Sequence, residues 1–544
     1  MKDYRPIKNE RPKRKKWPVI LTAAAAVAVC GVGFAVYNHM QQPDTAAHGG
    51  SKNAGTMPGR EGSSGGYSIS SSSQEATETG RRILEAGGNA ADAAVAMSYA
   101  LTVSEPHACG VGGGGCMLIY DPKTEQYYFY DYGAEAPESE STWQVLVPGF
   151  VSGMEAVNED LGTMEMADLM EPAIGYCDGV KISKVLETKM KNSQRYLMDN
   201  PVFTENGELK KAGDTLVQED MKETLEQIAQ KGAECFYSGS IAKDIIEATG
   251  LTMEDMAAYE TIRSDGVEGT YNGYEIASAP APFSGETLIQ ILKMTEQTDM
   301  PDPSEGAFTE TLNTIMKLAH SERVSHIYDL RFSENDIHQN DRVTDEYVAD
   351  LLKKEVGNIT LDEESEDTTA FTVIDKDGMI VACTNTLSSF FGSKIEVDGF
   401  YMNNTGTNFG TGVNSYEGGK RPRTHIAPTI LRSEDNIMAI ASPGGNVIEK
   451  VLSTVLMDIC AYGTDPQEAV DKQRIVCQGI DVIYYESGYD TPLFAALPEH
   501  SLTAIARSDH AYFGNIALSG YKKGVGYYYA EDIRRGGKGE AVTE

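Results

Sequence analysis

The chain has 544 residues, 41% of them hydrophobic, and carries a formal net charge of −35 at pH 7. This length and composition are typical of a globular protein with a large core, and they exclude a disordered tail. Residues 1–16 carry a net charge of +6, so the rest of the chain carries −41. Such an acidic body argues against nucleic acid as a partner.

The N-terminal segment has the pattern of a membrane anchor. A basic run at residues 13–16 precedes an apolar stretch over residues 17–37, and about 20 apolar residues suffice to cross a bilayer as a helix. By the positive-inside rule, residues 1–16 are cytoplasmic and the body is extracytoplasmic. A cleaved signal peptide is the alternative, but its apolar region is shorter and ends at a small-residue cleavage site. We therefore expect a membrane-anchored protein with one transmembrane helix.

Residues 38–74 are rich in Gly and Ser and predict a flexible linker. From Glu75 the pattern indicates two helices, separated by a Gly-Gly stop, with the second entered at Asn89. The glycine run "CGVGGGGC", residues 109–116, is compatible with a phosphate loop. However, no Lys-Ser/Thr follows it, and the next segment is strand-like rather than helical. A tight packing turn is the favoured interpretation.

Helical and strand-like patterns then alternate to the C-terminus without a second obvious linker, which predicts one large α/β or α+β domain. Eight cysteines without a CxxC pair and nine histidines without metal-ligand spacing predict no disulfide framework, no metal and no cofactor. The helical patterns include residues 150–162, 166–177, 215–232, 285–297 and 309–330, and the strand-like runs include residues 274–279, 370–375, 379–387 and 436–441.

A predicted hairpin brings two threonines together. "TTAFTVID" and "MIVACTNT" alternate like strands and flank "KDG", and Asp-Gly between such runs is a strong hairpin signal. With a three-residue loop at residues 376–378, Thr368 faces Thr386, and other loop lengths shift the pairing by one residue. Threonine is common in strands, so the pair alone does not establish a function.

A threonine becomes a good nucleophile when it is the first residue of a chain, because its own α-amine takes the hydroxyl proton. The pKa of an α-amine is about 7.7–8.0, so part of it is neutral near pH 7. This chemistry needs a cut before Thr368. Acyl transfer also needs oxyanion donors, and "IASPGGNVIEKV" offers a glycine turn before a helix whose first N–H groups are free. An ordinary strand-to-helix turn is the alternative for this segment.

Several motifs follow one another along the chain: "GRRILEAGGNAADAAVAMSYALTVSEPHACGVGGGG", "VPGFVSGMEAV", "LMEPAI", "DTTAFTVIDKDG", "FGS", "MNNTGTNFG" and "SPGG". Together they resemble the γ-glutamyltranspeptidase family, and the resemblance runs from about residue 75 to the end. It implies an N-terminal-nucleophile hydrolase with a four-layer αββα sandwich, an α+β fold. It also implies a precursor that cuts itself into a large subunit, residues 75–367, and a small subunit, residues 368–544.

The resemblance assigns roles by position. It implies that Thr368 is the nucleophile and the new N-terminus, and that Thr386 is its hydroxyl partner. Gly444 and Gly445 would donate to the oxyanion. The hairpin argument brings the two threonines together independently of the resemblance.

The chain departs from the family at its substrate-binding positions. Gly133, in "DYGAEAP", stands where the family has an arginine that holds the glutamyl α-carboxylate. Asn408 stands where an acidic residue binds the α-amine, Thr424 and His425 replace paired serines, and Ser388 replaces an asparagine. These changes imply that the reaction machinery is retained while substrate recognition is altered.

Arg421 and Arg423 lie beside the altered segment, and a guanidinium binds a carboxylate well. Arginines near a loop are usually solvated, so neither is the favoured replacement for the lost cation. With both charged contacts to a free amino-acid head missing, we expect poor turnover of glutathione and of γ-glutamyl anilides. Donors whose α-amine is acylated or absent, such as polymeric γ-glutamyl chains or glutaryl amides, are expected to react better.

The expected function is therefore a γ-glutamyltransferase-like enzyme that cleaves itself before Thr368 and transfers a γ-glutamyl or related acyl group, as in glutathione degradation. Its expected partners are a small or polymeric γ-glutamyl donor and an amine or water acceptor. The alternatives are a poly-γ-glutamate depolymerase, a glutaryl or cephalosporin-acylase-like amidase, and a catalytically silent surface-binding homologue. The Thr-Thr and Pro-Gly-Gly elements argue against the silent homologue.

Overall fold

The protein is described here by a computed structural model. No helix of the described part is both long and apolar enough to cross a membrane. The predicted cytoplasmic segment at residues 1–16 and the predicted anchor at residues 17–37 lie outside that part. Within it, no group of three or more His, Cys, Asp or Glu side chains is arranged to hold a metal ion, and seven cysteines are free thiols. The described residues are 66–139, 144–333, 338–357, 359, 367–480, 482–488 and 502–543.

The fold begins earlier than the predicted linker allows. Strand β1 (Tyr67–Ser71) is buried and pairs with a strand on each side, so the linker boundary at residue 74 is wrong. Its serines give the strand the polar composition of a linker, but their hydroxyl groups form hydrogen bonds inside the fold. Ser70 Oγ, for example, donates a hydrogen bond of 3.0 Å to the Ala530 carbonyl. Composition alone therefore cannot distinguish this strand from a tether.

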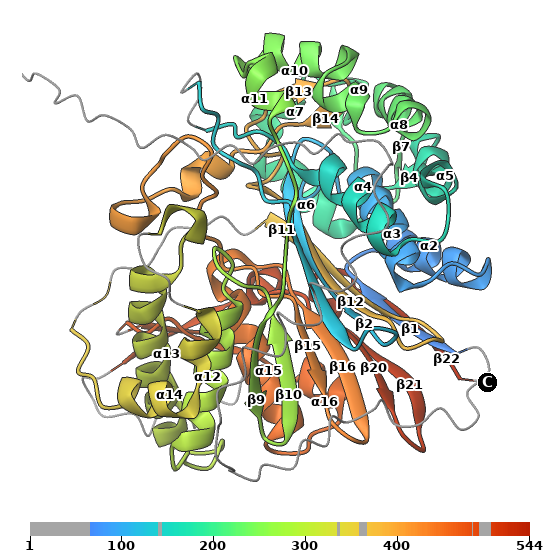
Figure 1. Cartoon of the computed structure of the whole chain (residues 1–544). Helices are drawn as coiled ribbons and strands as arrows, with labels where there is room; N and C mark the ends of the chain where they lie inside the picture. The colour runs from blue at the N-terminus through green and yellow to red at the C-terminus, as the bar shows by residue number, and fades with distance from the viewer. Residues whose placement is uncertain are drawn as a thin grey trace, which may run out of the picture. The chain divides into compact units, whose positions relative to one another are not determined.

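Two antiparallel sheets lie face to face at the centre of the fold (Figure 1). The first, in the order β22-β1-β11-β12-β2-β3-β8, comprises Lys538–Val542, Tyr67–Ser71, Asp367–Ile374, Ile380–Ser388, Gly114–Asp121, Gln126–Asp131 and Ile262–Ser264. The second, in the order β21-β20-β16-β15-β10-β9, comprises Gly526–Glu531, Ala517–Lys522, Asn436–Ala441, Thr429–Arg432, Tyr274–Ser278 and Val267–Tyr271.

Helices cover the outer face of each sheet, which gives the predicted α+β sandwich of four layers (Figure 1). Alternate residues of β12 show why both faces are apolar. Val381 and Cys383 belong to the core under the first helical layer, whereas Ile380 and Ala382 belong to the core between the sheets. The first helical layer contains α2 (Gln74–Glu85), α3 (Ala90–Ser104), α4 (Phe150–Leu161), α5 (Met166–Cys177) and α8 (Glu219–Lys231), and the second contains α12 (Gly285–Gln297), α13 (Gly306–His326) and α15 (Ile448–Cys460).

Shorter elements connect these layers. The helical and strand-like patterns of the sequence fall on observed elements of the predicted type, except that residues 215–216, at the start of the helix predicted over 215–232, form a strand. The shorter helices are α6 (Lys184–Asn192), α7 (Gln194–Leu197), α9 (Glu234–Tyr237), α10 (Ser240–Thr249), α11 (Met253–Ala257), α14 (Asp345–Leu351) and α16 (Pro466–Asp471). The shorter strands are β4 (Val180–Lys181), β5 (Thr204–Glu205), β6 (Glu208–Leu209), β7 (Thr215–Leu216), β13 (Glu396–Val397), β14 (Phe400–Tyr401), β17 (Ile475–Cys477), β18 (Val482–Glu486) and β19 (Thr503–Arg507).

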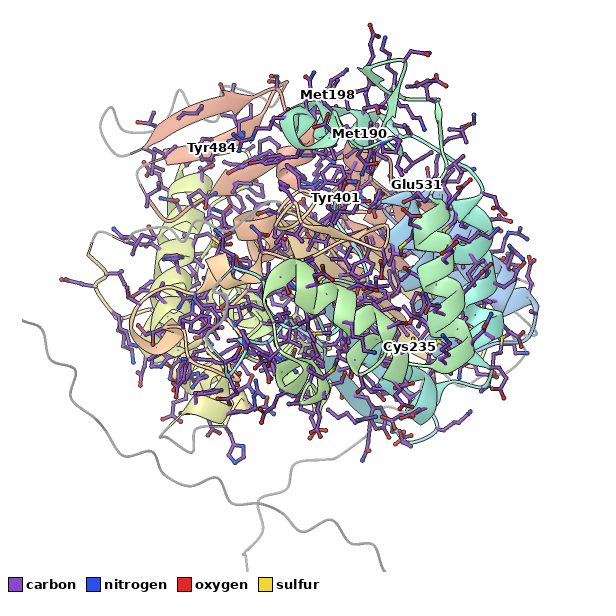
Figure 2. All side chains as sticks on the ribbon, turned by 90° about the horizontal axis from the view of Figure 1, so that it is seen from above. Met190, Met198, Cys235, Tyr401, Tyr484 and Glu531 are labelled. Atoms are coloured by element: carbon purple, nitrogen blue, oxygen red, sulfur yellow. The ribbon has the colours of Figure 1, made fainter. Side chains whose placement is uncertain are left out.

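The glycine run is a tight packing turn that leads into β2, as predicted. A Cβ atom on Gly115 would lie 2.3 Å from the Thr384 carbonyl oxygen, and one on Gly113 would lie 2.4 Å from the Thr386 carbonyl oxygen. Gly112 packs in the same way against the backbone of Tyr401, a buried residue that is labelled in Figure 2. Only glycine fits so close to these backbones, so the run brings β2 tightly against the end of β12.

The hairpin of β11 and β12 is tied to the first helical layer by one carboxylate. Asp375, at the turn, accepts hydrogen bonds from the backbone N–H groups of Asp377 and Met379 through Oδ1, at 2.8 and 3.0 Å. Its Oδ2 accepts from the N–H of Ala90, 2.9 Å away, at the start of α3. Burial raises the pKa of Asp375, while these three N–H donors oppose that shift. The turn and the helix therefore share one anchor.

Replacing this anchor should destabilise the fold. Asp375→Ala leaves three buried N–H groups without their acceptor, and we expect a loss of about 2–4 kcal/mol in the free energy of unfolding. Denaturant unfolding at pH 7 measures the loss. The matched control is Asp377→Ala in the same turn, whose side chain is exposed and which should cost less than about 0.5 kcal/mol. Equal stabilities of the two variants would contradict the anchoring role.

Candidate active site

Thr368 lies at the start of the regular part of β11 and is 7% exposed. Its Cα partner across the ladder is Thr386, so the predicted facing of the two threonines is confirmed. The backbone N–H of Gly444 donates a hydrogen bond of 3.1 Å to Thr368 Oγ1. The hydroxyl is therefore the acceptor of a fixed backbone donor, which favours negative charge developing on that oxygen.

The peptide bond before Thr368 leaves the regular ladder. Asp367 pairs with Ser388 and Thr368 with Thr386, so the register shifts between residues 367 and 368. Ser388 has a φ of 77°, in the left-handed region that non-glycine residues rarely adopt, and its N–H donates 2.8 Å to Thr386 Oγ1. Bulges and unusual backbone angles gather at functional sites. This irregularity falls on the bond that the sequence predicts to be cut.

A glycine turn presents the donor to Thr368. β16 ends at Ala441 and α15 begins at Ile448, as the sequence predicts, with the Pro-Gly-Gly turn between them. Gly444 has a φ of 146°, which a residue with a side chain rarely adopts, and this angle accompanies the approach of its N–H to Thr368. Gly445 follows with a φ of 59°, and its part as a second oxyanion donor stays a prediction.

A single cavity adjoins both threonines. Ser388, Asn408 and Thr424, three of the predicted substrate-binding residues, line it together with Thr368 and Thr386. Ser388 Oγ donates a hydrogen bond of 3.2 Å to Asn408 Oδ1, so these two side chains are already coupled across the cavity wall. The structure thus gathers the predicted nucleophile and three of the predicted substrate-binding positions around one cavity.

His425 lies behind this wall, 1% exposed, and is not part of the cavity lining. Its Nδ1 is 2.9 Å from Glu449 Oε1, in the first turn of α15. Burial lowers the pKa of His425 to about 3, and Arg323 adds to this effect, so the ring is neutral and Nδ1–H donates to the carboxylate. The pKa of Glu449 is lowered because His425 and Lys450 outweigh the effect of burial. The pair holds the helix after the glycine turn against the segment that carries Thr424.

The sequence model of the family described as Gamma-glutamyltranspeptidase matches residues 76–542. The chain belongs to the γ-glutamyltranspeptidase family. It is therefore a transpeptidase or hydrolase type of enzyme.

Sequence matches between this family member and its relatives cover most of its length. The chain is 35% identical to the capsule biosynthesis protein CapD proenzyme of Bacillus anthracis over 464 residues, which are 84% of this chain and 87% of that protein. It is 32% identical to the glutathione hydrolase proenzyme of Bacillus subtilis strain 168 over 484 residues, covering 78% and 82% of the two chains. The cephalosporin acylase of Bacillus halodurans has the same fold, with a TM-score of 0.79, 22% identity and coverage of 92% and 99%.

The cavity wall of this γ-glutamyltranspeptidase-family protein contains a buried cation. Gly133 lines the cavity without a side chain, and Arg421 lines it too. We expected Arg421 to be solvated, but it is buried, with Nη1 2.7 Å from Asp131 Oδ1. Arg423 instead donates 3.1 Å to the Val324 carbonyl and is absent from the lining. Sequence reasoning missed Asp131 as well, although it begins the "DYGAEAP" run that contains Gly133.

The neutral His425 predicts a pH dependence of stability. Its folded pKa of about 3 lies below the unfolded value of 6.5, so between these values the unfolded chain binds a proton that the folded chain does not. Stability therefore falls as the pH drops below about 6.5. His425→Gln removes this term, and the loss of unfolding free energy between pH 7 and pH 5 should shrink by about 2 kcal/mol.

Denaturant unfolding at pH 7 and pH 5 tests this expectation. The exposed His338 provides the matched control, because His338→Gln should leave the pH dependence as in the wild type. If His425→Gln shows the wild-type difference between the two pH values, the ring is protonated in the folded chain and the assigned tautomer is wrong.

Proposed function

We propose that this γ-glutamyltranspeptidase-family enzyme activates itself by cutting the Asp367–Thr368 bond and then transfers or hydrolyses a γ-glutamyl group through an ester on Thr368. The observation that carries the proposal is the Gly444 N–H on Thr368 Oγ1, at a register shift opposite Thr386. The names of the two relatives, each a proenzyme, support it.

Self-cleavage and acyl transfer both use Thr368 Oγ and the Gly444 turn. In the precursor, Thr368 Oγ attacks the carbonyl carbon of Asp367, and the C–N bond to Thr368 breaks as the hydroxyl proton passes to the departing nitrogen, which leaves an ester and a free α-amine on Thr368. Water then hydrolyses this ester and frees the Thr368 hydroxyl and the Asp367 α-carboxylate. In turnover, that amine takes the Oγ proton, and Oγ attacks the γ-carbonyl carbon of the donor. The Gly444 turn stabilises the oxyanion, the leaving amine takes the proton, and water or an amine resolves the ester.

The lining of the cavity supports the proposal that the α-nitrogen of the donor carries no charge. Asn408 is a neutral amide, and its Oδ1 already accepts a hydrogen bond from Ser388. A charge-assisted bond is about twice as strong as a neutral one, so this wall holds an ammonium more weakly than a carboxylate would. We therefore favour donors with an acylated α-amine, such as units inside a γ-linked glutamyl chain. The similarity to a capsule biosynthesis proenzyme is consistent with a polymeric donor.

We further propose that residues 17–37 anchor the enzyme in a membrane, with the catalytic domain outside the cytoplasm. The apolar stretch after the basic run supports this placement. Fractionation of the full chain, with protease added to intact cells, tests it. Degradation of the body from outside supports the placement, and a protected, soluble body contradicts it.

Self-cleavage is the first test of the proposed reaction. Residues 38–544, expressed alone, should yield a fragment of 177 residues that begins Thr-Thr-Ala-Phe, as mass spectrometry would show. Thr368→Ala should remain intact and inactive, because the attacking hydroxyl is gone. The matched control is Thr384→Val, which removes a buried hydroxyl of the same hairpin that has no hydrogen-bond partner among the described residues, and it should still cleave. Cleavage of Thr368→Ala would refute the role of Thr368.

Donor choice is the second test. The wild type should have a higher kcat/KM for an N-acetyl-γ-glutamyl anilide than for the γ-glutamyl anilide with the same leaving group. Asn408→Asp supplies a charged acceptor for an ammonium, so the ratio of the two kcat/KM values should shift about 10-fold towards the free γ-glutamyl donor. A wild type that strongly prefers the free donor, with no shift in Asn408→Asp, would contradict the proposed role of Asn408.

A further inference from the structure

The Pro-Gly-Gly turn after β16 is preceded by a serine whose hydroxyl contacts the peptide unit next to Thr368. Ser442 is 1% exposed, and its Oγ donates a hydrogen bond of 2.8 Å to the Pro443 carbonyl. This carbonyl and the Gly444 N–H belong to one planar peptide unit and point to opposite sides of it. The Gly444 N–H donates 3.1 Å to Thr368 Oγ1. A single rigid unit therefore joins the Ser442 hydroxyl to the proposed nucleophile.

The direction of the Ser442 hydroxyl is set by a second neighbour. The backbone N–H of Asn515 donates to Ser442 Oγ at 3.2 Å, so the oxygen is an acceptor on that side. Its one proton is then directed to the Pro443 carbonyl. Asn515 is itself held in place, because it is 0% exposed and its Oδ1 accepts from the Arg535 backbone N–H at 3.0 Å. The fold therefore fixes both the place and the direction of this hydroxyl.

Backbone packing shields this hydrogen bond from solvent. A Cβ atom on Gly514 would lie 2.6 Å from Ser442 Oγ and 3.0 Å from the Pro443 carbonyl oxygen. Pro443 and Gly444 are buried as well. A hydrogen bond is electrostatically stronger in such an environment of low dielectric constant than in water. The contact from Ser442 is therefore a strong restraint on the orientation of the peptide unit.

The peptide unit needs such a restraint because its own backbone permits two orientations. A flip of the Pro443–Gly444 peptide changes only ψ of Pro443 and φ of Gly444. Gly444 has a φ of 146°, and glycine adopts positive and negative φ about equally readily. In the flipped orientation a carbonyl oxygen faces Thr368 in place of the N–H. That oxygen would repel the negative charge that develops in acyl transfer, so only one orientation supports the reaction.

We propose that Ser442 is a positioning residue, whose hydroxyl holds the Pro443–Gly444 peptide with its N–H towards Thr368. The inference rests on the proposed function of the same site and adds a residue to it. Ser442 and Asn515 are not among the described residues that line the cavity, so the hydroxyl acts through Gly444 and not on the donor. Loss of the hydroxyl should therefore lower kcat and leave KM nearly unchanged.

Steady-state kinetics of Ser442→Ala tests this role with N-acetyl-γ-glutamyl and γ-glutamyl anilides that share one leaving group. With rates normalised to the cleaved fraction, kcat should fall about 10- to 100-fold, less than the loss of about 10²- to 10³-fold for removing an oxyanion donor outright. The loss should be equal for the two donors, because the Gly444 N–H meets the reacting oxygen and not the α-nitrogen. Self-cleavage uses the same turn, so a time course by mass spectrometry should show it slowed as well.

Matched variants distinguish the hydroxyl from general packing. Ser442→Thr keeps a hydroxyl and should restore most of the wild-type kcat. If its extra methyl group prevents folding, Ser442→Cys carries the test, because a thiol is a weaker donor and its kcat should lie between those of Ser442→Ala and the wild type. Ser453, in α15, is 0% exposed, and its Oγ donates 2.9 Å to the Lys450 carbonyl. Ser453→Ala therefore loses an equivalent hydrogen bond outside the turn, and it should keep the wild-type kcat.

Crystal structures distinguish a failure of this inference from a failure of the proposed function, because the orientation of the peptide is visible whether or not the enzyme is active. Ser442→Ala should show the Pro443 carbonyl turned towards Thr368 in some or all of the molecules. A wild type that neither cleaves itself nor turns over either anilide refutes the proposed function alone. The wild-type peptide orientation in Ser442→Ala, an unchanged kcat in that variant, or an equal loss of kcat in Ser453→Ala overturns the role of Ser442.

Discussion

The antiparallel pairing of β11 with β12 is the constraint on which the active site depends. Both faces of this ladder are buried, so a slip of one residue would exchange the side chains of two different cores. Asp375 holds one end of the hairpin, and Thr368 and Thr386 face each other at the other end. The strand register that packing requires thereby also sets the position of Thr368, the proposed nucleophile, to within one residue.

Two buried ion pairs lie near the cavity, and they differ in where they are placed. A buried ion pair is weak evidence for stability, because the cost of removing two charges from water offsets much of their attraction. The pair of Arg421 and Asp131 nevertheless lies in the cavity wall, while the pair of His425 and Glu449 lies behind it. The first pair borders the cavity that Thr368 lines, and the second joins α15 to the segment of Thr424. Burial alone does not distinguish these two roles, whereas the cavity does.

The sequence predicted well those features of the fold that depend on neighbouring residues, and poorly those that depend on contacts between residues far apart in the chain. The pairing of Thr368 with Thr386 follows from alternation and one Asp-Gly turn, both of which lie within a short stretch of chain. Strand β1 escaped prediction because its serines are satisfied by a partner such as Ala530, 460 residues away. No pattern near residue 70 records that distant contact, and a serine-rich strand therefore has the composition of a linker.

The cation in the cavity wall shows why position in a motif does not predict which residue reaches a given place in the fold. The glycine at residue 133 suggests that a positive charge is missing. A buried guanidinium is nevertheless present, from Arg421, whose partner Asp131 is 290 residues away in the chain. A ligand contacts a hydrogen-bond donor at a given place in the fold, and any segment of the chain that reaches this place can supply the donor. A Cβ atom on Gly133 would lie 3.1 Å from Asp131 Oδ1 and 3.6 Å from Arg421 Cδ, so residues 131, 133 and 421 meet at one place in the cavity wall. The cation in the cavity wall therefore depends on a long-range contact, while the position of the proposed nucleophile, Thr368, depends on a local one.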